Sequence, residues 1–189
     1  MKHVVRSMVA VAAAGVFGLL MPGQSHAAAG TARQSEPAGV ASTAGYYPNV
    51  DHIVCEINKE RANLGLPELL ISDRASDVAQ AHARDMSKLD RLTSVGSDGR
   101  DLRTRLSDAG IFSSYIHEFM FSGYEHDGYF ADMATDPDAE NGFYKVLMSP
   151  DVVALGLGYE SRYWDVDLLG QHRHLVTRAA DCDGNAAAE

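Results

Sequence analysis

The apolar residues of this chain change their spacing part-way along, and that change limits the folds open to it. Between Val50 and Ala109 they recur every three or four residues, which predicts helices. From Tyr115 onward, alternating and continuous apolar segments predict strands. Helices that precede strands indicate an α+β domain with a mainly antiparallel sheet.

Local signals give each predicted element its ends. Asn49 or Asp51 is a suitable cap for the first helix and Ser72 for the second, while Gly65 and Gly110 are suitable stops. We predict helices at residues 50–64, 73–89 and 101–109, a helical turn or two at 129–133, and strands at 115–122, 152–160, 162–169 and 172–178.

The first 27 residues have the layout of a secretory signal peptide. A basic start precedes an uncharged, mostly apolar run from Met8 to Met21, and Ser25 and Ala27 are the small residues of a cleavage site after Ala27. The run of 14 residues is shorter than the ~20 that a spanning helix needs, and no later stretch is suited to spanning. We therefore expect residues 1–27 to be removed and the remainder to be exported.

Removal of this segment makes an acidic chain more acidic. It takes away Lys2 and Arg6 and no acidic residue, so the net charge falls from −10 to −12. A chain without a clustered basic surface is a poor ligand for nucleic acid or anionic lipid. Residues 28–45 are rich in small residues and predict a flexible linker, which leaves a domain at 46–183 and a disordered tail at 184–189.

The chain contains two cysteines, Cys55 and Cys182. An even number in an exported chain indicates one disulfide, which here would join the first helix to the C-terminal segment. A loop of that length would stabilise the fold by roughly 4 kcal/mol in the chain-entropy model. The alternative is two separate buried thiols.

A series of short motifs follows the order of a known family. They are INKERANLGLP with Leu69 (residues 57–69), AQAHARDM (79–86), SDG with Arg103 or Arg105 and Ala109-Gly110 (97–110), and SPDV, GLGY and YW (149–164). Together they resemble bacterial CAP domains, the superfamily of cysteine-rich secretory, antigen 5 and pathogenesis-related proteins, also called SCP-like. The resemblance spans most of residues 50–170. It implies a three-layer α-β-α sandwich in which helices flank a mainly antiparallel sheet.

The same resemblance implies a cleft with two histidines and two acidic residues that can hold a divalent metal. Carried over by position, the histidines fall at Ser94 and Ala139, the Glu-Asn strand motif falls on Glu118 and Phe119, and Asp101 is nearest to the remaining acid. One retained glutamate cannot supply the ligands that a metal needs. We therefore expect no metal or other cofactor and no assignable catalytic residue, and keep Ser94, Glu118, Phe119 and Ala139 as cleft-lining candidates.

Two other metal-binding patterns are weaker. His172 and His174 would share one face of a strand and could bind zinc with His117 or His126, but they meet no fixed ligand spacing and suit exposed polar positions. Residues 136–142 resemble a calcium loop without the glutamate at its twelfth position, so a solvated acidic turn is favoured. No Gly-x-Ser-x-Gly motif indicates a serine nucleophile.

Periodicity also predicts on which face of a strand or helix individual side chains lie. Alternation along residues 115–122 places Tyr115, His117, Phe119 and Phe121 on one face and Ile116, Glu118 and Met120 on the other. Most aromatic residues between positions 115 and 143 are expected in the core, although some could line a groove for an apolar or sugar ligand. His82 lies on an apolar helix face, where a hydrogen-bonded core residue is expected.

Three functional hypotheses follow. The favoured one is a secreted, non-catalytic CAP-like domain, extracellular or associated with the cell wall, that binds a protein, glycan or lipid. The second is an exported hydrolase with Glu118 as general base beside His117 or His126, although Glu118 and His117 point to opposite faces of an ideal strand. The third is a structural or interaction module of the cell envelope, with residues 28–45 as a spacer.

Overall fold

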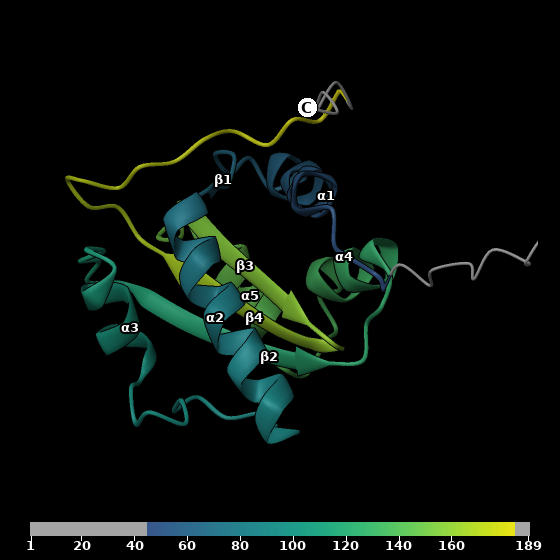
Figure 1. Ribbon diagram of the computed structural model, residues 1–189. Coiled ribbons are helices and arrows are strands. Elements are labelled where there is room, and N and C mark those ends of the chain that lie inside the picture. The colour runs from purple at the N-terminus through teal and green to yellow at the C-terminus, as the bar shows by residue number, and fades with distance from the viewer. Residues whose placement is uncertain (1–44, 184–189) are drawn as a thin grey trace, which may run out of the picture. The chain divides into compact units, whose positions relative to one another are not determined.

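Four strands form one mixed sheet between two layers of helices in the computed structural model, which describes residues 45–183 (Figure 1). The strands are β1 (Leu70–Ile71), β2 (Ile116–Ser122), β3 (Ala154–Glu160) and β4 (Tyr163–Leu169), in the order β1-β3-β4-β2. The β3–β4 and β4–β2 pairs are antiparallel, and the short β1–β3 pair is parallel. The predicted α-β-α sandwich with a mainly antiparallel sheet is therefore confirmed, with one parallel pair added.

The helices divide between the two faces of this sheet. They are α1 (Val50–Asn63), α2 (Asp73–Leu89), α3 (Leu102–Asp108), α4 (Asp127–Thr135) and α5 (Phe143–Leu147). Helix α2 crosses one face over β3 and β4, while α1, α4 and α5 pack on the other, and Figure 1 shows α5 behind the sheet when α2 is in front. Asn49, Ser72 and Asp101 cap the first three helices. Asn49 and Ser72 were expected as caps, whereas Asp101 was expected as the first residue of its helix.

Three short segments differ from the sequence prediction. The predicted strand at residues 172–178 is wrong: the segment turns at His172, whose carbonyl oxygen accepts a hydrogen bond from the amide of Leu175, and only Arg178 forms a bridge, to Ile71. Strand β1 and helix α5 were not predicted. Two residues of strand and five of helix are too few to establish a period.

Helix α2 rests directly on the backbone of β3, because two glycines there have no side chain. A Cβ atom on Gly156 would lie 2.3 Å from the carbonyl carbon of Ala75, and one on Gly158 would lie 2.2 Å from the amide nitrogen of Gln80. The α2 residues above them are small as well, and Ala75 and Ala79 are fully buried. This contact sets the height of α2 above the whole sheet.

Side chains of α2 also close the edge that β1 is too short to cover. The hydroxyl of Ser76 accepts a hydrogen bond from the Leu157 amide at 3.2 Å. Gln80 accepts from the Tyr159 amide at 3.0 Å and donates to its carbonyl oxygen at 2.8 Å. The amide of Leu157 and both backbone groups of Tyr159 are therefore satisfied by a helix, which protects an exposed sheet edge.

An aromatic core fills the opposite face. Phe130 of α4 stacks on Trp164 of β4 with ring centroids 4.2 Å apart, and Phe143 of α5 contacts Phe119 and Phe121 of β2. The prediction that most aromatic residues between positions 115 and 143 lie in the core is confirmed. The prediction of which residues of 115–122 share each face of the strand is confirmed as well.

Arg61 explains one of the family-like motifs in structural terms. Its guanidinium is buried and donates to the carbonyl oxygens of Pro67, Leu147, Ser149 and Val152, so that it joins α1 to the end of α5 and the entry to β3. Burial lowers the pKa of this guanidinium. Arg61 therefore has a structural role, because its hydrogen bonds hold α1, α5 and β3 together.

The predicted disulfide is confirmed. Cys55 of α1 and Cys182 are bonded, with their Cα atoms 5.6 Å apart. Within residues 45–183, no helix has both the length and the apolar character that a membrane crossing requires. The expected signal peptide at 1–27, nearly all of the expected linker at 28–45 and the expected tail at 184–189 lie outside the described residues.

The close approach of α2 gives a direct test. We expect Gly158→Ala to destabilise the fold by at least about 2 kcal/mol, because the new methyl group overlaps the α2 backbone. Gly45→Ala is the matched control, since a Cβ at Gly45 meets nothing within 4 Å. Urea unfolding midpoints measure both, and equal midpoints would contradict the described packing.

Candidate functional site

Five ionisable side chains are enclosed between α2, α3 and the sheet. They are His82 of α2, Arg105 of α3, Glu118 of β2 and Asp165 and Asp167 of β4, here called the buried charge cluster. The two aspartates are fully buried, and the side chains of Arg105 and Glu118 are each 8% exposed.

The sheet register places the three acids on one face. Glu118 lies directly opposite Asp167 in the β2–β4 pair. Asp165 is two residues before Asp167 and therefore lies on the same face of β4. Gly156 and Gly158 are the β3 partners of Asp167 and Asp165. Because α2 lies so close above these glycines, it also covers the two aspartates.

Arg105 is the cation of the cluster. It forms an ion pair with Glu118 through Nη2, and its Nη1 donates to the carbonyl oxygens of Ser94 at 3.2 Å and Arg100 at 3.0 Å. The guanidinium thus ties β2 to the loop that follows α2. A buried carboxylate needs such a partner to keep its charge.

His82 is a buried, hydrogen-bonded residue, as its position on α2 predicts. Its Nε2 lies 2.7 Å from the carbonyl oxygen of Thr93 and 3.8 Å from Oε1 of Glu118. The carbonyl can only accept, so Nε2 carries the proton of the neutral ring. Burial, followed by the charge of Arg105, lowers the pKa of His82, which keeps the ring neutral.

The aspartates lack partners. Among the described residues, no group donates to either carboxyl oxygen of Asp165 or of Asp167. Burial raises the pKa of both aspartates well above the ordinary value, and repulsion from Glu118 adds to the effect. Burial also raises the pKa of Glu118, to about 7, even though Arg105 opposes the shift. The cluster is electrically neutral when Glu118 is ionised and both aspartates hold protons.

These properties restrict the chemistry of Glu118. A general base must come within hydrogen-bond reach of a substrate proton, whereas Glu118 is enclosed and already pairs with Arg105. Neither proposed partner is brought to it: His117 faces the opposite side of β2, where it contacts the ring of Tyr115, and His126 caps α4.

The four cleft-lining candidates divide between two places. Ser94 and Glu118 meet at the guanidinium of Arg105. Phe119 packs in the aromatic core on the other face, and Ala139 lies between α4 and α5, where its amide donates to the carbonyl oxygen of Asp136. No imidazole stands at Ser94 or Ala139, so these residues do not fit the metal that the family resemblance implies.

A different set of ligand atoms does converge. Among residues 45–183, His82, Glu118 and Asp165 offer one nitrogen and two oxygens that all lie within 4.8 Å of one another. Neither the histidine pair at 172 and 174 nor the acidic turn at 136–142 forms such a group in the described part of the chain. His82 was expected only as a core residue, and Asp165 was not among the expected site residues.

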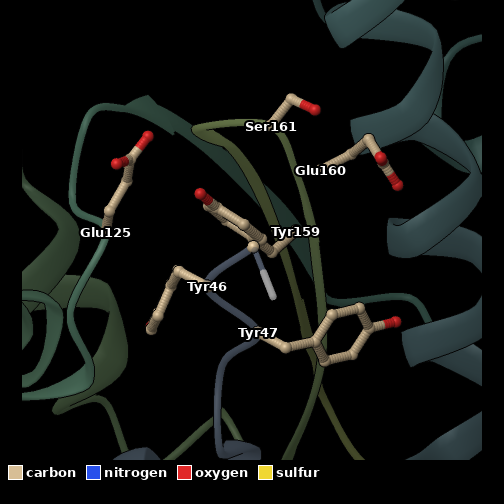
Figure 2. A pocket seen from close by; sticks show the side chains of 7 residues that line it. Tyr46, Tyr47, Glu125, Tyr159, Glu160 and Ser161 are labelled. Carbon is tan, nitrogen blue, oxygen red and sulfur yellow. The ribbon is translucent and has the colours of Figure 1, made fainter. Parts of the chain in front are cut away.

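A second feature is open to solvent. A pocket of about 380 Å³ forms where β3 ends and the described chain begins. Gly45, Tyr46, Tyr47, Glu125, Tyr159, Glu160 and Ser161 line it, and here it is called the tyrosine pocket. Figure 2 shows Tyr159 at its centre, with Glu125 to one side and Glu160 to the other. Tyr47 is the most accessible ring, with 73% exposure.

The tyrosine pocket is preorganised and acidic. Tyr46 donates a hydrogen bond to Asp127 and meets Tyr159 edge to face at 5.0 Å between centroids. Burial, with repulsion from Glu125 and Glu160, raises the pKa of Tyr159. Arg84 offsets part of this charge through an exposed pair with Glu160 at 3.4 Å, which stabilises only weakly.

Comparison with known proteins identifies the fold. The model of the CAP, or cysteine-rich secretory protein, family matches residues 54–166. The chain is 18% identical to an extracellular SCP-domain protein of Bacillus anthracis, with a TM-score of 0.56 and a match over 63% of this chain and 39% of that one. A comparison with curated proteins gave no match.

Two further solved structures are similar. An outer surface protein of Borrelia burgdorferi is 18% identical, with a TM-score of 0.53 and coverage of 64% of this chain and 90% of that one. A cysteine-rich secretory protein of Staphylococcus aureus is 13% identical, with a TM-score of 0.52 and coverage of 63% and 37%. This chain thus spans less than half of the Bacillus and Staphylococcus proteins, and at these identities the likeness concerns the fold alone.

Arg105 can be tested against its neighbour on α3. We expect Arg105→Gln to destabilise the fold by about 3 kcal/mol, because Glu118 would keep its burial and lose its cation. Arg103→Gln removes the same charge from the exposed side of α3 and should change stability by no more than ~0.5 kcal/mol. Denaturant unfolding at pH 7 distinguishes them, and equal effects would contradict the assigned role.

The raised pKa values of the acids predict an alkaline loss of stability. Unfolding returns these carboxyls to ordinary pKa values near 4, so above that pH the folded state binds more protons than the unfolded state. The free energy of unfolding should therefore fall as pH rises from about 4 through 7, by ~1.4 kcal/mol per pH unit for each proton of difference. Urea unfolding with a chelator present measures this slope.

Asp165→Asn is the comparison for the pH experiment. The amide cannot ionise, so the variant should lose less stability than the original chain over the same pH range. Identical slopes in the two proteins would show that Asp165 does not titrate with a raised pKa.

Proposed function

This chain belongs to the cysteine-rich secretory protein (CAP) family, and we propose that it acts outside the cytoplasm as a non-catalytic domain that binds a cationic ligand in the tyrosine pocket. The single observation that carries the proposal is a contrast in accessibility. The one glutamate retained from the family's cleft is enclosed and paired, whereas the tyrosine pocket is open and lined by aromatic rings and carboxylates.

Three observations support an extracytoplasmic site of action. Cys55 and Cys182 form a disulfide, and disulfides persist in oxidising compartments and are rare in the cytosol. The expected signal peptide at residues 1–27 would direct the chain there. Similar folds occur in an extracellular protein and in an outer surface protein. Attachment to the cell wall remains part of this proposal.

The chemistry of the pocket favours a positively charged group. An ammonium or guanidinium group over a tyrosine face gains electrostatic attraction, and the carboxylates of Glu125 and Glu160 add to it. The net negative charge of the domain would steer a cation toward the tyrosine pocket and repel anionic lipid headgroups. Of the ligand classes considered from the sequence, an extracellular protein that presents lysine or arginine side chains fits best.

Tyr47 is the residue to test. We expect Tyr47→Ala to weaken binding of a fluorescent lysine-rich peptide about fivefold to tenfold, because the most exposed ring of the pocket is lost. Tyr129→Ala is the matched control, since Tyr129 is 68% exposed on α4 and does not line the pocket. Fluorescence anisotropy at fixed salt measures both affinities.

Charge provides the second arm of the same experiment. Acetylation of the lysines removes the positive charge and should abolish binding to the original chain. Equal binding of the acetylated peptide, or equal effects of Tyr47→Ala and Tyr129→Ala, would refute the cationic pocket. A preference for neutral glycans or lipid vesicles would move the proposal to another ligand class.

One observation favours a hydrolase as the second candidate. The pKa of Glu118, about 7, is near the value at which a carboxyl group exchanges protons most effectively at neutral pH. Hydrolysis by the purified chain that disappears in Glu118→Gln would establish this alternative, and would require Glu118 to become accessible to a substrate.

A further inference from the structure

Two buried aspartates without partners require an explanation. Both oxygens of Asp165 and both oxygens of Asp167 are enclosed, and no donor reaches any of them among residues 45–183. Buried polar atoms in native proteins nearly always have a partner, and an orphaned carboxylate indicates a proton, a water molecule or an ion beside it. The neighbouring groups distinguish between these possibilities.

The donor types around Asp165 suit a metal of intermediate hardness. His82, Glu118 and Asp165 bring one imidazole nitrogen and two carboxylate oxygens to within 4.8 Å of one another. Mixed nitrogen and oxygen ligands favour Zn²⁺ and related transition-metal ions, whereas Ca²⁺ and Mg²⁺ prefer oxygen alone. The three residues come from α2, β2 and β4, so the fold itself assembles the set.

The charges of the cluster agree with a divalent ion. Ionised Glu118, Asp165 and Asp167 carry three negative charges, and Arg105 supplies one positive charge. A net charge of −2 remains inside the protein, where an uncompensated charge is strongly unfavourable. One divalent cation restores neutrality without requiring protons on the aspartates.

Two hydrogen bonds already orient the ligands. Nε2 of His82 lies 3.8 Å from Oε1 of Glu118 and donates to the Thr93 carbonyl, so the lone pair of the neutral ring is on Nδ1. A metal bound at Nε2 would replace that proton and its hydrogen bond, whereas a metal bound at Nδ1 would keep both. Metal-binding histidines characteristically donate their other ring nitrogen to a carbonyl or carboxylate. Arg105 pairs with Oε1 of Glu118, and within the described chain no hydrogen-bond donor reaches Oε2.

We propose that His82, Glu118 and Asp165 bind one divalent metal ion of the Zn²⁺ type beneath α2, with Arg105 and Asp167 completing its charge environment. This set differs from the one that the family resemblance implies, in which the two histidines fall at Ser94 and Ala139. A pocket of about 420 Å³ lies between α2 and α3, and Arg105 and Ala81 are among the residues that line it. The ion serves the stability of the sandwich and is independent of ligand binding in the tyrosine pocket.

The test begins with the metal-free, oxidised chain, to which Zn²⁺ is added with excess Ca²⁺ and Mg²⁺ present. We expect one equivalent of Zn²⁺ per chain by isothermal titration, together with a rise in the thermal unfolding midpoint, since an ion that binds only the folded state stabilises it. Co²⁺ added in place of Zn²⁺ should give visible absorption bands, which report a low-symmetry nitrogen and oxygen ligand field independently of stability.

Variants identify the ligands. His82→Gln and Asp165→Asn should each weaken Zn²⁺ binding by more than tenfold and remove the Co²⁺ bands, since loss of even a supporting residue weakens metal binding 10- to 100-fold. The amide of Asp165→Asn cannot ionise, so the metal-free variant avoids the unfavourable ionisation of a buried carboxyl group as pH rises and should fold at least as stably as the original chain at neutral pH. Its failure to bind would therefore reflect a lost ligand.

Two controls remove equivalent groups elsewhere. His117→Gln takes an imidazole from the opposite face of β2, and Glu125→Gln takes a carboxylate from the tyrosine pocket. Both should bind Zn²⁺ as the original chain does. No binding by the original chain, undiminished binding by His82→Gln and Asp165→Asn, or equal losses in the two controls would overturn the proposal.

Discussion

The contact between the α2 backbone and the two glycines of β3 determines most of what is distinctive in this molecule. A side chain at Gly156 or Gly158 would overlap the helix, so α2 can approach the sheet only because these positions are empty. At that distance Ser76 and Gln80 reach the backbone of β3 and close its free edge. The same approach covers the neighbouring strand β4, whose side chains on this face must then be buried whatever their polarity.

Asp165 and Asp167 occupy those covered positions, and their burial makes the charge cluster unusual. A buried ion pair alone contributes little net stability, because desolvation opposes the attraction between the partners. Here Arg105 neutralises one carboxylate and leaves two that must bind protons or share an ion. The cluster is therefore sensitive to its surroundings although it is closed to substrates, and this separates it from the tyrosine pocket, which is open and contains no orphaned buried group among the described residues.

The sequence predicted those features that depend on period or on local signals. The α2 bounds, the caps at Asn49 and Ser72, the facing of residues 115–122 and the buried state of His82 all follow from spacing along one element. Strand β1 and helix α5 were missed because each is shorter than one clear period. The strand expected at 172–178 does not form, because a local turn at His172 competes with strand pairing in this segment.

The site was harder to predict, because its members come together only in three dimensions. Position-by-position transfer from the family selected Glu118 and Ser94, which both contact Arg105. It also selected Phe119, which alternation places on the opposite face. Asp165 and Asp167 gave one overlooked signal: in a sandwich with helices on both faces, two carboxylates on a central strand must be buried. Arg105 is one of two arginines on a short helix, and only the packing of α3 against β2 distinguishes it from Arg103.

The central claim is that the acids beneath α2 are internal and unavailable to substrates, and that Asp165 and Asp167 hold protons when no metal is present. Infrared difference spectroscopy of the metal-free chain at neutral pH tests this claim most directly, because protonated and ionised carboxyl groups absorb at different frequencies. The account predicts protonated carboxyl bands that exchange slowly in deuterated water and diminish in Asp165→Asn and in Asp167→Asn. Fully ionised, rapidly exchanging carboxylates in the folded protein would contradict it.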